Sequence, residues 1–351
     1  MENSKRLRYG LTSRDARIPR GGAVSLEKWI YENADKLNLK VVSYTWPRYF
    51  GLNYFDISVS MIHEKKKYIG RGTALDEQNA LLKASVECIE RIFCAFNKTS
   101  SNGVAAHYNK NIAKKNALNE LLERDSFFCS YLTLANHPSI STDIFLNLRE
   151  ILESKYKILI QYFDISAYQT PKTILAVATG NKFIRPFGLC IGLGTNSNLE
   201  QAIQSSSSEI IRNITALIFD KKTKNIFQTK SPLPSVKYKA HTPITPDGHM
   251  KYINEISNLH RFENWLQNSS PRLLNPVIRS SIPKIQYTQL ASPKLFNKCP
   301  LHVYKANAAS LFQEAYWGKT TKRKINLKRI QEYAGCNIKF NDLNLNIHPL
   351  G

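Results

Sequence analysis

Two stretches of the sequence repeat one pattern of small and acidic residues. Residues 70 to 87 read GRGTALDEQNALLKASVE, and residues 192 to 209 read GLGTNSNLEQAIQSSSSE. Each contains Gly-x-Gly-Thr, an Ala eight positions after the second glycine, a small residue four positions later and a Glu three positions after that. Because a repeated pattern signals a repeated structural unit, we expect the chain to be built around two copies of one element.

Each copy predicts a strand, a tight glycine turn and a helix. Short strand-like runs, KKYI and FGLCI, precede the two Gly-x-Gly motifs, and apolar residues at helical spacing follow them. One face of each predicted helix is polar and carries Lys83, Glu87, Glu90 and Arg91 in the first copy, and Ser205, Glu209 and Arg212 in the second. The pattern therefore predicts a mixed α/β (α+β) fold.

A third helix, expected from about residue 116 to 135, carries carboxylates in the same arrangement. Glu120, Glu123 and Arg124 stand 33 positions after Glu87, Glu90 and Arg91. In one helix alone, such spacing is typical of a solvated, salt-bridged face. If the three polar faces converge, their carboxylates must be neutralised, and Mg²⁺ held by carboxylates commonly binds the phosphates of a nucleotide.

The charge balance allows an anionic partner but does not identify one. Lys and Arg number 49 against 27 Asp and Glu, a net charge of +22. The basic residues are scattered, and no helix-turn-helix, zinc-finger or RNP signature supports nucleic-acid binding. We interpret them as solvated faces, some of which steer an anionic ligand. The densest block, residues 319 to 329, is expected to help hold phosphates or an acidic peptide.

Several common classes of protein find no support in the sequence. The six cysteines show no Cys-x-x-Cys spacing, so we expect buried thiols in a reducing compartment. No run of about 18 apolar residues predicts a membrane span, and a soluble cytoplasmic protein is expected. GKT at 318–320 lacks the first glycine of a P-loop, and Gly-x-Gly-Thr lacks the third glycine of a dinucleotide fingerprint.

Taken together, the motifs resemble those of the YcaO family, ATP-dependent enzymes that modify peptide backbones. The resemblance rests on Gly70-x-Gly72 followed by ASVECIER, on SSNGVAAH, on ALNELLERD, and on GLGT leading to SSSSEIIR. It is strong from about residue 60 to 220 and weak from 301 to 330. It implies a YcaO-like domain over 61–351. The Pro- and Ser-rich region at about 231–300 is expected to be variable surface decoration, with a peptide-facing lid as the alternative. The segment 1–60 stays unassigned.

The resemblance implies a site for ATP and Mg²⁺ and names candidate residues for it. The implied metal ligands are Glu87, Glu90 and Glu209, with Glu120 and Glu123 as further ligands, supports or purely structural residues. The implied nucleotide contacts are Ser85, Ser101, Asn102, Gly103, Ser205 and Arg212, although Arg212 stands where the family commonly has Gln. The terminal carboxylate of Gly351 is an implied catalytic group, but the ending IHPLG keeps only Pro349 of a Pro-x-Pro-x-Pro tail.

The reaction implied by the resemblance is cyclodehydration of a ribosomally made precursor peptide, as in bacteriocin maturation. Cys, Ser or Thr side chains would become thiazolines or oxazolines after phosphorylation of the amide oxygen. Alternatives are a thioamide- or amidine-forming enzyme of the same family, or a catalytically silent scaffold. The expected partners are the precursor peptide and a separate leader-peptide-binding protein, and a homodimer is a further option. Neither a membrane nor nucleic acid is an expected partner.

Overall fold

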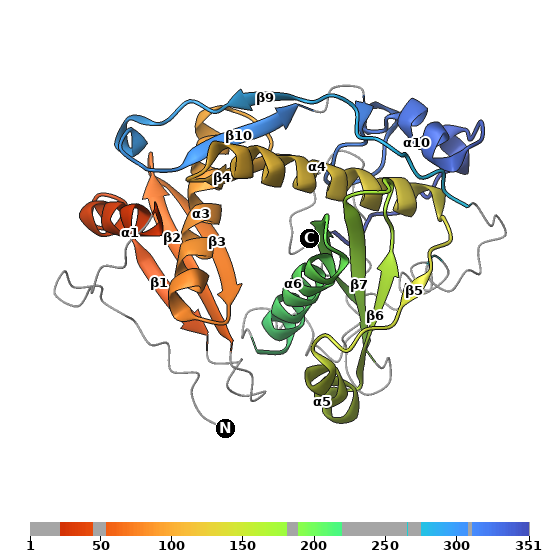
Figure 1. Ribbon diagram of the computed structural model, residues 1–351, viewed down its shortest axis with the longest axis horizontal. Helices are drawn as coiled ribbons and strands as arrows, with labels where there is room; N and C mark the ends of the chain where they lie inside the picture. The colour runs from red at the N-terminus through yellow and green to blue at the C-terminus, as the bar shows by residue number, and fades with distance from the viewer. Residues whose placement is uncertain are drawn as a thin grey trace. The chain divides into compact units, whose positions relative to one another are not determined.

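The computed structural model describes residues 22–44, 54–180, 189–219, 265, 275–307 and 311–350. The chain divides into two compact units (Figure 1). Unit 1 comprises Met1–Glu120 and Ile285–Asn307, and unit 2 comprises Leu121–Lys284 and Ala308–Gly351. Each unit combines helices with antiparallel sheet, which confirms the expected mixed α/β class.

Unit 1 contains the first copy of the repeat. Strands β1 (Lys40–Tyr44), β2 (Phe55–His63) and β3 (Lys66–Ala74) form an antiparallel sheet in that order. Helix α3 (Glu77–Phe96) packs on the face made by β2 and β3, and the shorter helix α1 (Gly22–Asn33) contributes Leu26, Trp29 and Ile30 to the same core. Burial of this apolar surface is the main force that holds helix and sheet together.

A second small sheet of unit 1 joins segments far apart in the sequence. Its strand order is β4 (Val104–His107), β10 (His302–Asn307) and β9 (Gln286–Gln289). The sequence LHVYKA predicts a strand, and β10 confirms it. Strand β9 comes from the region expected to be surface decoration, and it pairs with β10 over four residue pairs. Helix α4 (Lys110–Thr133) follows β4, begins in unit 1 and ends in unit 2.

Unit 2 contains the second copy of the repeat. Strands β5 (Ser139–Ile140), β6 (Ile158–Asp164), β7 (Lys172–Gly180) and β8 (Leu189–Asn196) form an antiparallel sheet in that order. Helix α5 (Leu146–Tyr156) packs against β6, and helix α6 (Leu199–Phe219) packs on β7 and β8. The C-terminal segment adds helix α10 (Leu327–Ala334) and the 3₁₀ turns η3 (Lys322–Lys324) and η4 (Phe340–Asp342). The 3₁₀ turn η1 (Lys294–Phe296) belongs to unit 1.

The repeated glycines lie inside strands, so the expectation of a tight glycine turn was wrong. Gly72 is in β3 and Gly194 is in β8, and each pairs with an isoleucine of the preceding strand. A Cβ at Gly72 would stand 2.2 Å from the carbonyl oxygen of Ala80, and one at Gly194 would stand 2.2 Å from that of Ala202. The glycines, with the small residues Ala80 and Ala202, let the strand and helix backbones pack in direct contact.

Other expectations had mixed outcomes. The third helix is confirmed, although it starts at Lys110, before the expected residue 116. Four cysteines are buried as expected, but Cys299 is half-buried, and Cys336 is exposed because it follows the helix-ending Gly335. The sequence MKYINEISNLHRFENWLQ predicts a helix from 250 to 267, most of which lies outside the described residues. None of the helices in the described part of the chain is both long and apolar enough to cross a bilayer.

Candidate functional site

Equivalent glutamates of the two copies hold the backbone of an edge strand. In unit 1, the N–H of Arg71 in β3 donates a hydrogen bond of 2.7 Å to Oε2 of Glu87 in α3. In unit 2, the N–H of Leu193 in β8 donates one of 2.8 Å to Oε2 of Glu209 in α6. Strands β3 and β8 are both at the edge of their sheets, and the donor in each is the residue between the two glycines.

Two further glutamates of unit 1 bind an edge strand in the same way. The N–H of Ala106 donates to Oε1 of Glu90 at 2.6 Å, and the N–H of Val104 donates to Oε2 of Glu120 at 3.2 Å. Both donors belong to β4, which is the edge of the small sheet. In all four pairs the donor and acceptor residues are 16 positions apart in sequence.

These contacts explain why carboxylates stand among core-like neighbours. An edge strand presents N–H groups that no neighbouring strand can accept, and unpaired backbone donors are costly when water is excluded. A carboxylate accepts such a donor in a short, charge-assisted hydrogen bond. Each glutamate is thereby fixed in one orientation by rigid secondary structure, which is how a preorganised binding site is built.

The carboxylates of unit 1 also act on one another electrostatically. Desolvation raises the pKa of Glu90 well above its usual range, and the negative charges of Glu120 and Glu87 raise it further. The N–H of Ala106 and the cation of Arg91 oppose this shift. A group of desolvated like charges is unfavourable on its own, so this cluster is suited to binding a cation.

One difference between the two copies concerns the number of carboxylates. A shift of 122 residues superimposes Glu87 on Glu209, and it also places Arg212 of the second copy where the first has Glu90. Glu87 accepts a hydrogen bond of 2.7 Å from Nη2 of Arg91, and Glu209 forms an ion pair of 3.9 Å with Arg212. The first copy is therefore richer in carboxylates, and the second supplies a cation at the matching place.

The resemblance to YcaO proteins implies a turn at residues 100 to 103, and a turn is present there in unit 1. Gly103 has a positive φ of 66°, and the N–H of Val104 donates to the carbonyl of Ser101 at 3.1 Å. Ser101 is exposed and Asn102 is half-buried. The N–H of Val104 also reaches Glu120, so the turn and the carboxylate cluster share a donor.

Lys305 of β10 is a residue of this region that the sequence did not single out. Its Nζ donates to Oγ1 of Thr99 at 2.7 Å and to the carbonyl and Oγ of Ser100 at 3.2 and 3.1 Å. It lies opposite Val104 in the pairing of β10 with β4. The one available signal was a lysine within the apolar strand LHVYKA, a cation that needs a partner when its stem is packed in a sheet.

The remaining predicted residues lie in varied surroundings. Ser85 is fully buried in α3, and its hydroxyl has no hydrogen-bond partner among the described residues. Ser205 is exposed on α6. Glu123 belongs to unit 2 and lies 3.8 Å from the guanidinium of Arg124. Gly351 is outside the described residues. Glu87, Glu90, Glu120 and the turn thus gather in unit 1, whereas Ser205, Glu209, Arg212 and Glu123 belong to unit 2, and their meeting in one site stays a prediction.

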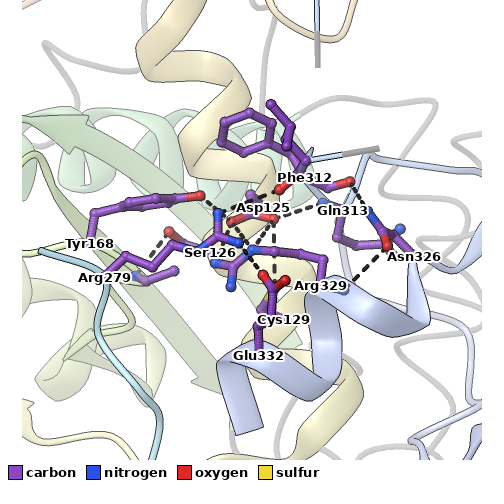
Figure 2. Close-up of polar contacts among 12 residues, drawn as sticks. Asp125, Ser126, Cys129, Tyr168, Arg279, Phe312, Gln313, Asn326, Arg329 and Glu332 are labelled. Carbon is purple, nitrogen blue, oxygen red and sulfur yellow. Dashed lines mark hydrogen bonds and ion pairs between the residues drawn. The ribbon is translucent and has the colours of Figure 1, made fainter. Parts of the chain in front are cut away.

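A second residue that the sequence did not single out is Asp125, which directly follows Glu123 and Arg124. Figure 2 shows hydrogen bonds converging on its carboxylate from several segments of unit 2. The side chain is fully buried and pairs with the buried guanidinium of Arg329 in α10. The available signal was an acidic residue immediately before the apolar run SFFCSYL, because a buried Asp must be paired.

The donor set suits Mg²⁺, which prefers oxygen ligands. Within the described ranges, which leave out 45–53, 181–188 and most of 220–274, no group of three or more His, Cys, Asp or Glu side chains could hold a metal ion. Mg²⁺ is usually bound through one or two carboxylates together with the phosphates of a nucleotide. Pairs of the oriented glutamates, such as Glu87 and Glu90 of unit 1, fit that mode.

Comparison with known proteins identifies the family of the chain. The family model described as YcaO cyclodehydratase, ATP- and Mg²⁺-binding, matches residues 93–266. No curated protein is detectably similar to the chain in sequence. The chain belongs to the YcaO family, and the cofactors of this ATP-dependent type of enzyme are ATP and Mg²⁺.

Solved structures share the fold at low sequence identity. The YcaO protein of Methanopyrus kandleri bound with AMPPCP and Mg²⁺ matches with a TM-score of 0.56 at 13% identity, over 85% of this chain and 93% of its own. A heterocyclase in complex with substrate and cofactor matches with a TM-score of 0.58 at 10% identity, over 96% of this chain and 58% of its own. These likenesses confirm a YcaO-type architecture.

Proposed function

We propose that this protein is an ATP- and Mg²⁺-dependent cyclodehydratase that converts Cys, Ser or Thr residues of a ribosomally made precursor peptide into thiazolines or oxazolines. The observation that carries the proposal is the set of four glutamates held by outward N–H groups of edge strands, two of them at equivalent positions of a repeat. Such oriented carboxylates suit a metal–nucleotide site, and the family model that the chain matches is that of the cyclodehydratases.

The chemistry requires activation of a poor leaving group. A side-chain thiol or hydroxyl adds to the preceding amide carbon, and the amide oxygen can then leave only as part of a better group. That addition already closes the ring. ATP supplies a γ-phosphoryl group for the oxygen, which then departs as phosphate while the amide nitrogen loses its proton and the C=N bond forms, so that the peptide has lost the elements of one water.

The residues of this chain would contribute binding and orientation. Glu87, Glu90 and Glu209 would hold Mg²⁺, and Glu120 and Glu123 would support them. Ser205, Arg212 and the turn Ser101–Gly103 would contact the nucleotide, and Lys305 would keep the turn in place by its three hydrogen bonds.

The partners and location belong to the same proposal. The heterocyclase that shares the fold was solved with its substrate, and we propose a precursor peptide as the substrate here. A separate protein would bind the leader part of that peptide. A cytoplasmic location would give the enzyme access to ATP and Mg²⁺.

The test is an incubation of the purified protein with ATP, Mg²⁺ and the short peptides encoded beside it in its source genome. The proposal predicts a peptide that loses the mass of one water for each ring, with equal amounts of ADP and phosphate released. A mass change that replaces oxygen by sulfur would show thioamide formation. ATP binding without any peptide modification, in the presence of every neighbouring protein, would favour a silent scaffold.

A further inference from the structure

The C-terminal segment of unit 2 presents a surface with an excess of basic residues. Between Glu314 and Glu332 the sequence has no acidic residue and six basic ones. Arg329 is buried against Asp125, and Nζ of Lys324 folds back onto the carbonyls of Trp317 and Lys319 at 2.6 and 3.0 Å. The other four are exposed, and within the described part of the chain none of them forms an ion pair: Lys319, Lys322, Arg323 and Lys328.

These cations lie on or just after a closed loop, residues 313–326, whose ends are joined by hydrogen bonds. The N–H of Asn326 donates to Oε1 of Gln313 at 2.7 Å, and Nε2 of Gln313 donates to the carbonyl of Lys324 at 2.9 Å. Inside the loop, the hydroxyls of Tyr316 and Thr320 are hydrogen-bonded at 2.9 Å. Compact surface loops with joined ends are frequently functional.

The base of the loop is fastened to helix α4 by the buried Asp125 (Figure 2). The N–H of Gln313 donates to Oδ1 of Asp125 at 2.7 Å on one side of the loop, and Nη2 of Arg329 donates to Oδ2 at 2.7 Å on the other. One carboxylate therefore holds both flanks. A loop fixed in this way has little conformational entropy left to lose when a ligand binds.

The loop also exposes an aromatic side chain. Trp317 is 48% exposed although its neighbours Tyr316 and Gly318 are buried. Exposed Trp and Arg are the residue types enriched at the centres of protein interfaces. An indole flanked by cations suits a ligand that is both acidic and partly apolar.

We propose that loop 313–326, together with Lys328, is a preformed docking surface for an acidic segment of the peptide substrate. The proposal deepens the proposed function, on which it rests for the identity of the ligand. The exposed cations occupy one stretch of ten residues, 319–328, beside a single indole. That short extent fits a peptide segment better than a duplex, whose phosphates call for a basic face or stripe.

The test is a binding measurement that needs neither ATP nor catalysis. The probe is a fluorescein-labelled peptide of about 16 residues, half of them Glu and two of them Leu, followed by fluorescence anisotropy with the full chain. The surface predicts saturable binding that weakens as salt is added, because exposed charges are screened. The double variant Lys319→Glu/Arg323→Glu should bind at least about tenfold more weakly, and Trp317→Ala about threefold more weakly.

A matched control distinguishes binding at this surface from nonspecific attraction of the peptide to the overall positive charge of the protein. Lys36→Glu/Lys40→Glu changes two exposed lysines of unit 1 and alters the net charge by the same amount. The affinity of this control variant for the labelled peptide should stay within about twofold of the wild-type value. Equal losses in the two double variants would overturn the proposal, as would tighter binding of a DNA duplex through Lys319 and Arg323. Because the readout is peptide binding alone, a failure of the proposed chemistry would leave this result interpretable.

Discussion

Replacing Asp125 by Asn should strongly destabilise unit 2, because every acceptor site of its carboxylate is in use. Oδ1 accepts from the N–H of Gln313 at 2.7 Å and from Nε of Arg329 at 3.1 Å. Oδ2 accepts from the hydroxyl of Tyr168 at 2.9 Å and from Nη2 of Arg329 at 2.7 Å. Whichever way an Asn amide is turned, its NH₂ group faces donors, and one set of hydrogen bonds is lost.

The size of the expected stability loss follows from the burial of the ion pair between Asp125 and Arg329. Asp125 and Arg329 have side-chain exposures of 0% and 1%. Removing one partner of a buried ion pair costs about 3–5 kcal/mol, because the remaining charge is left desolvated. Nη1 of Arg329 is already buried with no hydrogen-bond partner among the described residues, so no spare acceptor is at hand. The double variant Asp125→Asn/Arg329→Met removes both charges, so its free energy of unfolding should fall by less than that of the single variant Asp125→Asn.

The assay is urea unfolding of the wild type, the two single variants and the double variant, followed by circular dichroism. Limited trypsin digestion supplies a second readout, since loss of the anchor should speed cleavage in the basic loop 313–326. Glu153→Gln, at an exposed position of α5, is the control and should change stability by no more than about 0.5 kcal/mol. A loss below about 1 kcal/mol for Asp125→Asn, or simple additivity of the two single changes, would refute the reasoning.

Three further predictions concern packing, pH and nucleotide binding. Gly194→Ala should destabilise unit 2 by about 3 kcal/mol in urea unfolding, because the new Cβ meets the helix backbone of α6 at 2.2 Å. Burial lowers the pKa of His137 from 6.5 to about 4. Since the unfolded chain then binds a proton that the folded chain excludes, the wild type should lose about 2 kcal/mol more than His137→Gln between pH 7 and pH 5. Lys305→Met should weaken ATP binding by about tenfold in calorimetry, and Lys305→Arg should restore part of it; an unchanged affinity would exclude a role for Lys305 in holding the turn.

The repeat and its consequences were predictable from the sequence. Gly-x-Gly-Thr followed at fixed spacing by small residues and a glutamate correctly indicated a strand and a helix in each copy. The position of the glycines was not predictable by the same reasoning. A Gly-x-Gly pair fits a tight turn or a close backbone contact equally well, and only the three-dimensional packing of α3 on β3 and of α6 on β8 distinguishes them.

Contacts between residues far apart in the chain could not be predicted from the sequence, for a physical reason. The contact between Lys305 and Ser100 joins residues 205 positions apart, and that between Asp125 and Arg329 joins residues 204 apart. Local periodicity carries no information about such pairs. The glutamates were identifiable because helical spacing and repetition are local features, whereas the N–H donors that orient them come from edge strands whose pairing is tertiary. The domain limits at residue 60 and the full set of metal ligands stay predictions.

The central proposal is that the repeated glutamates Glu87 and Glu209 are needed to bind ATP and Mg²⁺, and calorimetric titration of ATP tests it most directly. The titration compares wild type, Glu87→Gln and Glu209→Gln, with and without Mg²⁺. Glu77→Gln and Glu200→Gln, exposed in the first turns of the same two helices, are matched controls. The account predicts Mg²⁺-dependent binding by the wild type and both controls, and its loss in both Glu87→Gln and Glu209→Gln. Unchanged, Mg²⁺-dependent binding in either of these two variants would contradict it.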